Sequence, residues 1–88
     1  MANDQVKLEI LTPKGVIFSK KVNSVIAPGK LGSFGILPGH APLISSLGSG
    51  NIVIDEESGN KTNYKIDSGF LEVLDDLVTV LANSVDTV

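Results

Sequence analysis

Turn-forming residues interrupt this sequence at intervals of roughly 8–12 residues, which leaves room for short strands between them. Val6, Leu8 and Ile10 alternate with Lys7 and Glu9, a period of two that places the apolar side chains on one face of a strand. Patterns typical of helices are nearly missing from the rest of the chain. The sequence therefore predicts an all-β fold, an antiparallel β-sandwich or barrel of about 8–10 short strands.

Short apolar runs between the turns mark the predicted strands. Val16 to Phe18 and Val22 to Ala27 are typical of one longer bent strand, which Pro28-Gly29 ends. Leu77 to Ala82 is apolar on both faces, a pattern that predicts a central strand. The other strands are expected at residues 43–47, 51–55, 62–66 and 70–74. The close spacing of the turns between the last three strands implies antiparallel neighbours.

The size of the chain limits how much apolar surface it can bury. The 88 residues are enough for one domain, and such a domain buries only about 60% of the surface that its unfolded chain exposes. Hydrophobic residues make up 42% of the sequence, too many for a disordered segment. We therefore expect an apolar patch that a partner covers, as in a component of an assembly.

The charges argue against nucleic acid as a partner. The net charge is −3, and the seven basic residues are all lysines scattered along the chain, with Lys20-Lys21 as the only adjacent pair. Phosphate binding relies on a clustered basic face. The sequence has no cysteine for a disulfide or a thiolate. Its apolar runs are too short to cross a membrane, and Met1 to Gln5 lack the zones of a secretory signal.

No pattern in the sequence is typical of a catalytic, cofactor or metal site. His40 is the only histidine, and a metal or acid–base site requires partners for it. A hydrogen bond to the backbone, or packing at an interface, is the alternative that we favour for this residue. Gly29-Lys30 fails as a phosphate loop, because Ser24 and Leu31 occupy the positions of the first glycine and the hydroxyl residue. We expect no enzyme activity, cofactor or metal.

The densest group of turn residues lies in one segment between two apolar runs. This segment is Gly32-Ser33-Phe34-Gly35-Ile36-Leu37-Pro38-Gly39-His40-Ala41-Pro42-Leu43. Its glycines let the backbone approach a partner closely, and its prolines limit the entropy lost when the segment is fixed there. These properties favour a binding segment.

This segment and two others together resemble the epsilon subunit of F-type ATP synthases. The two others are Asp67-Ser68-Gly69-Phe70-Leu71-Glu72-Val73 and Val78-Thr79-Val80-Leu81-Ala82, and the resemblance covers essentially all 88 residues. It implies a flattened β-sandwich at residues 1–84 and a short tail at residues 85–88. It also implies that the C-terminal helical hairpin of the family is absent, and we expect this short form to be natural.

The resemblance implies a non-catalytic function. In the family, this sandwich belongs to the rotor at the foot of the central stalk, where it links the gamma shaft to the membrane c-ring during ATP synthesis coupled to proton transport. Such a subunit is peripheral on the cytoplasmic, or equivalent, face of an energy-coupling membrane and touches that membrane only through the ring. The helical hairpin inhibits ATP hydrolysis in the family and binds ATP in some members, and we expect neither activity here.

Two sets of contact residues follow from the resemblance. The predicted gamma contacts are Thr12, His40, Ala41, Pro42, Leu43 and Ser45. The predicted c-ring contacts are Pro28, Gly29, Lys30, Leu31, Gly32, Ser33, Phe34 and Gly35, with Ser33 and Phe34 expected at the tip of the turn. The family often has an acidic residue in this turn, whereas Lys30 and Ser33 stand here, so we expect the ring contact to depend on shape and on Phe34.

A free-standing β-sandwich adaptor or carrier domain is the alternative from another functional class. A carrier requires a modifiable lysine at a hairpin tip, and Lys61 lies beside such a turn. The residues around Lys61 resemble no attachment motif. The rotor component therefore remains the leading interpretation of the sequence.

Overall fold

The computed structural model describes residues 4–87, and all of the regular structure in this range is β-strand. The strands are β1 (Val6–Thr12), β2 (Gly15–Gly29), β3 (Gly32–Ile36), β4 (Leu43–Leu47), β5 (Gly50–Glu56), β6 (Lys61–Ile66), β7 (Gly69–Leu74), β8 (Leu77–Ala82) and β9 (Val85–Thr87). No helix in the described range is suited to crossing a membrane. The predicted all-β class and the predicted number of strands are confirmed.

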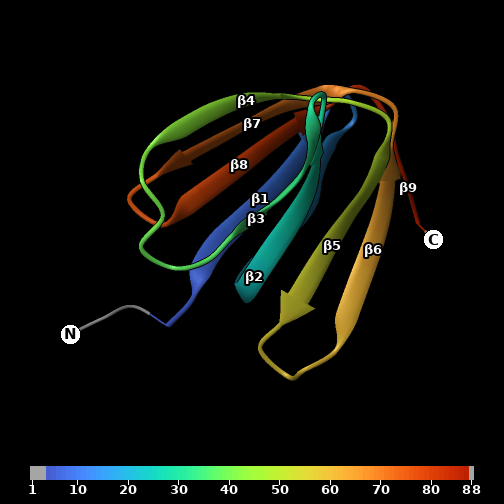
Figure 1. The fold of residues 1–88 in the computed structure, drawn as a ribbon. Helices are drawn as coiled ribbons and strands as arrows, with labels where there is room; N and C mark the ends of the chain where they lie inside the picture. Colours follow the sequence, from blue (N-terminus) through green and yellow to red (C-terminus); the bar gives the residue numbers. More distant parts are fainter. Residues whose placement is uncertain (1–3, 88) are drawn as a thin grey trace.

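The long strand β2 connects two layers of strands (Figure 1). Its first half pairs with β1, from Val22 opposite Val6 to Gly15 opposite Thr12. Its second half pairs with β5 on one side and with β3 on the other. The first layer therefore contains β4, β7, β8, β1 and the start of β2, and the second contains β3, the end of β2, β5, β6 and β9.

One pairing departs from the predicted antiparallel arrangement. β1 runs parallel to β8, with Leu8 opposite Val78 and Ile10 opposite Val80. The other strand pairs are antiparallel. Most of the chain separates β1 from β8, so no tight turn fixes their relative direction, and turn spacing alone could not predict it.

The core lies between the two layers and is entirely apolar. Alternate residues of each strand enter it, as in Val6, Leu8 and Ile10 of β1. On β8 the same alternation buries Val78 and Val80 and leaves Leu81 54% exposed. The prediction that β8 is buried on both faces is therefore wrong, although β8 does lie between β1 and β7.

Two strands lie where the sequence analysis expected none. β3 contains Gly32 and Gly35, which weaken its strand pattern, but its pairing with β2 and the burial of Ile36 stabilise it. β9 falls within the predicted tail at residues 85–88, and it pairs with β6 while Val85 packs against the core. In both strands the tertiary pairing outweighs a weak local preference.

Gly69 provides a test of the packing between β7 and β8. A Cβ atom at this position would collide with the backbone oxygen of Leu81 and lie 3.1 Å from the Cα of Ala82. We expect Gly69→Ala to lower the free energy of unfolding by about 2 kcal/mol, because backbone atoms cannot move aside as a flexible side chain can. Gly35→Ala is the matched control, since nothing lies within 4 Å of its added Cβ. Urea denaturation of both variants checks this, and equal losses would contradict it.

Candidate partner-binding surface

The outer side of β4, β7 and β8 carries a row of exposed apolar side chains, which we call the apolar face. Its members and their exposed fractions are Ile44 (75%), Phe70 (59%), Leu74 (51%), Leu77 (40%) and Leu81 (54%). Phe70 lies opposite Leu81, and Leu74 lies opposite Leu77. Glu72 and Thr79 face outward between these two pairs, and Ile44 lies opposite Glu72, so the face contains two apolar pairs and Ile44 around a polar centre. Apolar groups of this size that remain exposed side by side are typical of a surface that a partner covers.

The outer side of the other layer differs in composition. On β5 and β6 the outward positions include Asn51, Asp55, Lys61 and Lys65, which are polar or charged. Ile26 on β2 is the main apolar exception, with 44% of its surface exposed. The two outer surfaces of the sandwich are therefore not equivalent, and the one that carries the apolar face is suited to burial against another protein.

A groove of about 530 Å³ lies along one end of the apolar face. Leu11, Phe70 and Leu81 supply apolar walls, Thr12 lies at the end of β1, and Lys30 is the one charged residue in the lining. A smaller hollow of about 230 Å³ lies between Ile44, Phe70 and Leu81. The face is thus a shaped surface with room for partner side chains.

The β2–β3 turn forms a separate apolar projection, which we call the hairpin tip (Lys30 and Leu31). Gly29 lies opposite Gly32, so Lys30 and Leu31 alone make the turn. Leu31 is fully exposed, at 105% relative accessibility. Phe34 is instead partly buried against the core, and a Cβ on Gly29 would lie 2.9 Å from its ring. The prediction that Ser33 and Phe34 form the tip is therefore wrong.

His40 lies in the loop between β3 and β4, where its ring contacts the backbone. Its Nδ1 lies 2.6 Å from the carbonyl oxygen of Ala41. A carbonyl oxygen only accepts hydrogen bonds, so Nδ1 carries a proton and donates it in this contact. The hydrogen bond to backbone matches one of the two alternatives expected for this histidine.

The structure separates the predicted gamma contacts into two groups. His40, Ala41 and Pro42 lie before β4, and this loop touches the β7–β8 turn because the Gly39 N–H donates to Asp76. Thr12 lies at the other end of the same layer, in the groove that also contains Lys30.

Several predicted contact residues have little of their surface free. Leu43 is partly buried against the core, and Ser45 is half-buried, with its hydroxyl donating to the Ser46 carbonyl. Pro28 is buried, and Gly29 is half-buried beneath Phe34. Gly32, Ser33 and Gly35 are exposed on β3. The sequence alone could not predict these differences in exposure, because the burial of each residue depends on how the two layers pack together.

Sequence analysis missed the main members of the apolar face. Leu81 lies in the strand that the sequence analysis interpreted as apolar on both faces, and Ile44 and Phe70 each follow or precede an apolar residue in short apolar runs. Within β7, Glu72 stands between Leu71 and Val73. This alternation was the available sign that the even-numbered residues of β7 face outward.

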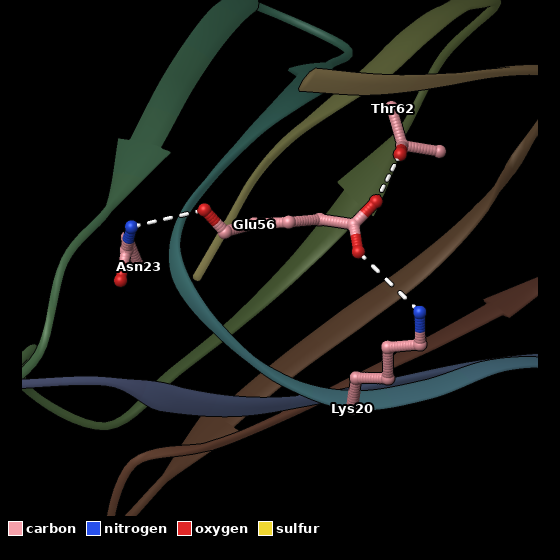
Figure 2. A network of polar contacts seen from close by, with 4 residues as sticks. All are labelled: Lys20, Asn23, Glu56 and Thr62. Atoms are coloured by element: carbon pink, nitrogen blue, oxygen red, sulfur yellow. Dashed lines mark hydrogen bonds and ion pairs between the residues drawn. The ribbon is translucent and has the colours of Figure 1, made fainter. Parts of the chain in front are cut away.

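A polar network joins β2, β5 and β6 (Figure 2). The Glu56 carboxylate accepts hydrogen bonds from the Thr62 hydroxyl and from Lys20 Nζ, which lies 3.4 Å away. Asn23 Nδ2 donates to the Glu56 carbonyl oxygen at 3.1 Å. Asn23 lies at the irregularity in the β2–β5 register, so the network fixes that distortion.

This network has no features of a catalytic or metal site. The Thr62 hydrogen bond, followed by the attraction of Lys20, holds the pKa of Glu56 below its usual value near 4.5. A carboxylate that stays ionised in this way is a stable acceptor and a poor general acid near neutral pH. Among residues 4–87, no group of three or more His, Asp or Glu side chains is placed to hold a metal ion.

The sequence matches a family described as "ATP synthase, Delta/Epsilon chain, beta-sandwich domain" over residues 5–87. The ATP synthase epsilon chain of Pelotomaculum thermopropionicum is 44% identical over 86 residues, which cover 98% of this chain and 63% of that relative. The epsilon chain of Campylobacter jejuni is 48% identical over 80 residues, which cover 91% of this chain and 62% of that relative. The chain thus spans less than two thirds of the length of these relatives.

Two solved structures share the fold. One is the cryo-EM structure of the Euglena gracilis mitochondrial ATP synthase (OSCP/F1/c-ring), in which one chain matches with a TM-score of 0.92 and 24% identity, covering 99% of this chain and 56% of that one. The other is the central stalk/c-ring of the Tetrahymena thermophila mitochondrial ATP synthase, with a TM-score of 0.77 and 13% identity, covering 99% of this chain and 69% of that one. At these identities the match concerns the fold.

The lowered pKa of Glu56 predicts how acid affects the stability of the polar network. A carboxyl group whose pKa is lower in the folded than in the unfolded state stabilises the fold above its unfolded pKa, near 4.5, and this contribution is lost as pH falls through the folded pKa. Thr62→Val removes the main cause of the shift, so we expect the variant to be less stable than wild type at pH 7, with a difference that shrinks below pH 4.5.

Urea denaturation at a series of pH values measures this difference. Asp67, whose pKa is lowered by its hydrogen bond from Asn83, also contributes to acid sensitivity. Asp67 is present in both wild type and Thr62→Val. Subtracting their curves of unfolding free energy against pH therefore isolates the contribution of Glu56. A difference that stays constant from pH 7 to pH 3 would mean that the Thr62 hydroxyl acts on stability without acting on this titration.

Proposed function

Since this chain belongs to the β-sandwich domain family of ATP synthase delta/epsilon chains, we propose that it is a non-catalytic rotor subunit of the central stalk. Its task is to link the gamma shaft to the membrane c-ring in ATP synthesis coupled to proton transport. Its proposed location is peripheral, on the cytoplasmic or equivalent face of an energy-coupling membrane. The two structural neighbours come from an OSCP/F1/c-ring assembly and from a central stalk/c-ring assembly, which supports the proposed role in the central stalk.

One observation carries the proposal, namely the exposed apolar face on β4, β7 and β8. Burying one large apolar side chain completely contributes about 1.5–3 kcal/mol, so covering five that are half-exposed is enough to drive association. We assign this face to gamma. The loop with His40, Ala41 and Pro42 begins β4, next to Ile44, and Thr12 lines the groove beside Phe70. The predicted gamma residues thus border the face without forming its centre.

We assign the hairpin tip to the c-ring. It combines the fully exposed Leu31 with the cationic Lys30 on a two-residue turn. The acidic residue that the family often has in this turn is replaced here by Lys30 and Ser33, so the proposed contact consists of an apolar side chain beside a positive charge. Phe34 supports the turn from beneath by packing over Gly29, and Leu31 takes the contact role that the sequence analysis gave to Phe34.

The two proposed contacts lie close together on the molecule. A hollow of about 450 Å³ is lined both by the hairpin tip and by Ile44 and Ser46 of β4. A subunit that transmits rotation must hold both partners on a body that deforms little. Here the tip and the apolar face are joined through the backbone, because Gly48 donates to Pro28 at 2.8 Å and Lys30 donates to Ser46 at 3.3 Å.

Calorimetric titration of the chain into the gamma subunit of the same source tests the first contact. We expect saturable one-to-one binding by the wild type and at least a tenfold weaker affinity for Phe70→Ser, since the loss of one buried aromatic group exceeds the 1.4 kcal/mol that corresponds to tenfold. Ile26→Ser is the matched control, because Ile26 is similarly exposed on the opposite layer. If a folded wild-type chain failed to bind gamma, the adaptor interpretation would replace this one.

The second contact is tested by Leu31→Ser. Because Leu31 touches solvent on all sides, this change should leave the unfolding free energy within about 0.5 kcal/mol of wild type. We expect it to weaken binding to purified c-ring and to leave gamma binding unchanged, whereas Phe70→Ser has the opposite pattern. Surface plasmon resonance against each partner measures both effects. If the two variants weakened both partners equally, the division of the surface would be wrong.

A further inference from the structure

The loop before β4 contains a tight turn held by a side chain from another hairpin. The N–H of His40 donates to the carbonyl oxygen of Leu37 at 3.2 Å, which closes a four-residue turn. Pro38 and Gly39 occupy its centre, and Gly39 has φ of +83°. Proline followed by a residue with positive φ is typical of a type II turn. The N–H of Gly39 donates to the Oδ1 of Asp76 at 2.8 Å.

This hydrogen bond acts on the one peptide unit that distinguishes the alternative turns. Type I and type II turns differ by a flip of the central peptide, which here joins Pro38 to Gly39. Flipping it would point the Gly39 N–H away from Asp76 and break the hydrogen bond. An ionised carboxylate is a strong acceptor for a backbone N–H, so the bond favours the type II form.

Asp76 is an unexpected residue for its own position. Asp75 and Asp76 form the two-residue turn between β7 and β8, with Leu74 opposite Leu77, and their φ angles are +50° and +61°. Glycine or asparagine is preferred in such a turn, because both central residues are left-handed. The carbonyl oxygen of Asp76 also accepts a hydrogen bond from the Lys7 N–H at 2.8 Å. Asp76 thereby connects β1, the β7–β8 turn and the loop before β4.

We propose that Asp76 is a positioning residue for partner binding, which holds the Pro38–Gly39 turn in its type II form and so presents His40, Ala41 and Pro42 in the bound conformation. The inference rests on the proposed function for the role of the loop in binding gamma. The structural part does not depend on it. A loop that is already fixed loses less entropy when a partner binds, and a loop that samples two turn types binds only with the competent fraction.

Asp76→Gly separates the two functions of this residue. Glycine adopts the left-handed turn more readily than aspartate, so the hairpin should be as stable as in wild type or more so. It has no acceptor for the Gly39 N–H, so the turn loses its restraint. Asp75→Gly is the matched control, since it relieves the same kind of backbone strain one residue earlier and leaves Asp76 in place. Asp76→Asn keeps a neutral acceptor oxygen and should give intermediate results.

Two measurements on the folded chain decide the proposal. In proton–nitrogen NMR spectra, Asp76→Gly should shift the Gly39 amide proton upfield and raise its exchange rate about tenfold, with no such change in Asp75→Gly. In titrations with gamma, Asp76→Gly should bind about five- to tenfold more weakly, through slower association, although its free energy of unfolding is no lower than that of wild type.

The outcomes separate this inference from the proposed function. An unchanged Gly39 amide in Asp76→Gly would overturn the positioning role outright. A released amide with undiminished gamma binding would overturn the role in binding and leave the proposed function standing. If the wild-type chain itself failed to bind gamma, the proposed function and the binding part of this inference would both be wrong, while the amide data would still decide whether Asp76 holds the turn.

Discussion

The arrangement of the whole domain depends on one strand that is hydrogen-bonded into both layers. β2 pairs with β1 through its first half and with β3 and β5 through its second, and the register changes between Val22 and Ser24 where it crosses from one layer to the other. The side chain of Asn23 and the carboxylate of Glu56 secure this crossing. Because β2 ends in the hairpin tip, the bend also determines where Leu31 projects. A change in the bend of β2 between the two layers would therefore move the hairpin tip relative to the apolar face.

The closure of the two layers explains why one outer surface remains apolar. An 88-residue domain has little interior, and one side of each strand already fills it. Ile44, Phe70 and Leu81 face away from that interior and cannot be buried by the chain itself. The outward positions of β5 and β6 in the opposite layer are mostly polar or charged. Packing of the core does not require this difference between the outward residues of the two layers. The difference is therefore the best physical argument for a partner on the apolar side.

The sequence predicted the strands that have a clear alternation or well-placed turns, and it failed where pairing between distant segments decides the structure. Val6, Leu8 and Ile10 identified β1 and its buried side, while its parallel neighbour β8 was not foreseeable from turn spacing. The glycines of β3 concealed a strand, and so the tip was assigned to Phe34 instead of Leu31. The family resemblance supplied the candidate contact residues, but it could not separate Thr12 from His40, because only the register places them at opposite ends of one layer.

The proposed rotor linkage would place two different demands on such a domain, and different parts of this one are suited to them. Transmission of rotation requires a body that does not deform, which the paired strands and the backbone hydrogen bonds between the tip and β4 provide. Assembly requires local segments that adopt one conformation before the partner arrives. The hairpin tip meets this through Phe34 beneath Gly29, and the loop before β4 meets it through Asp76. In both places a residue outside the contact holds the contact in shape, so substitutions that leave the surface unchanged can still weaken assembly. Phe34 acts by packing beneath Gly29, whereas the Asp76 side chain acts on the loop through its hydrogen bond with the Gly39 N–H.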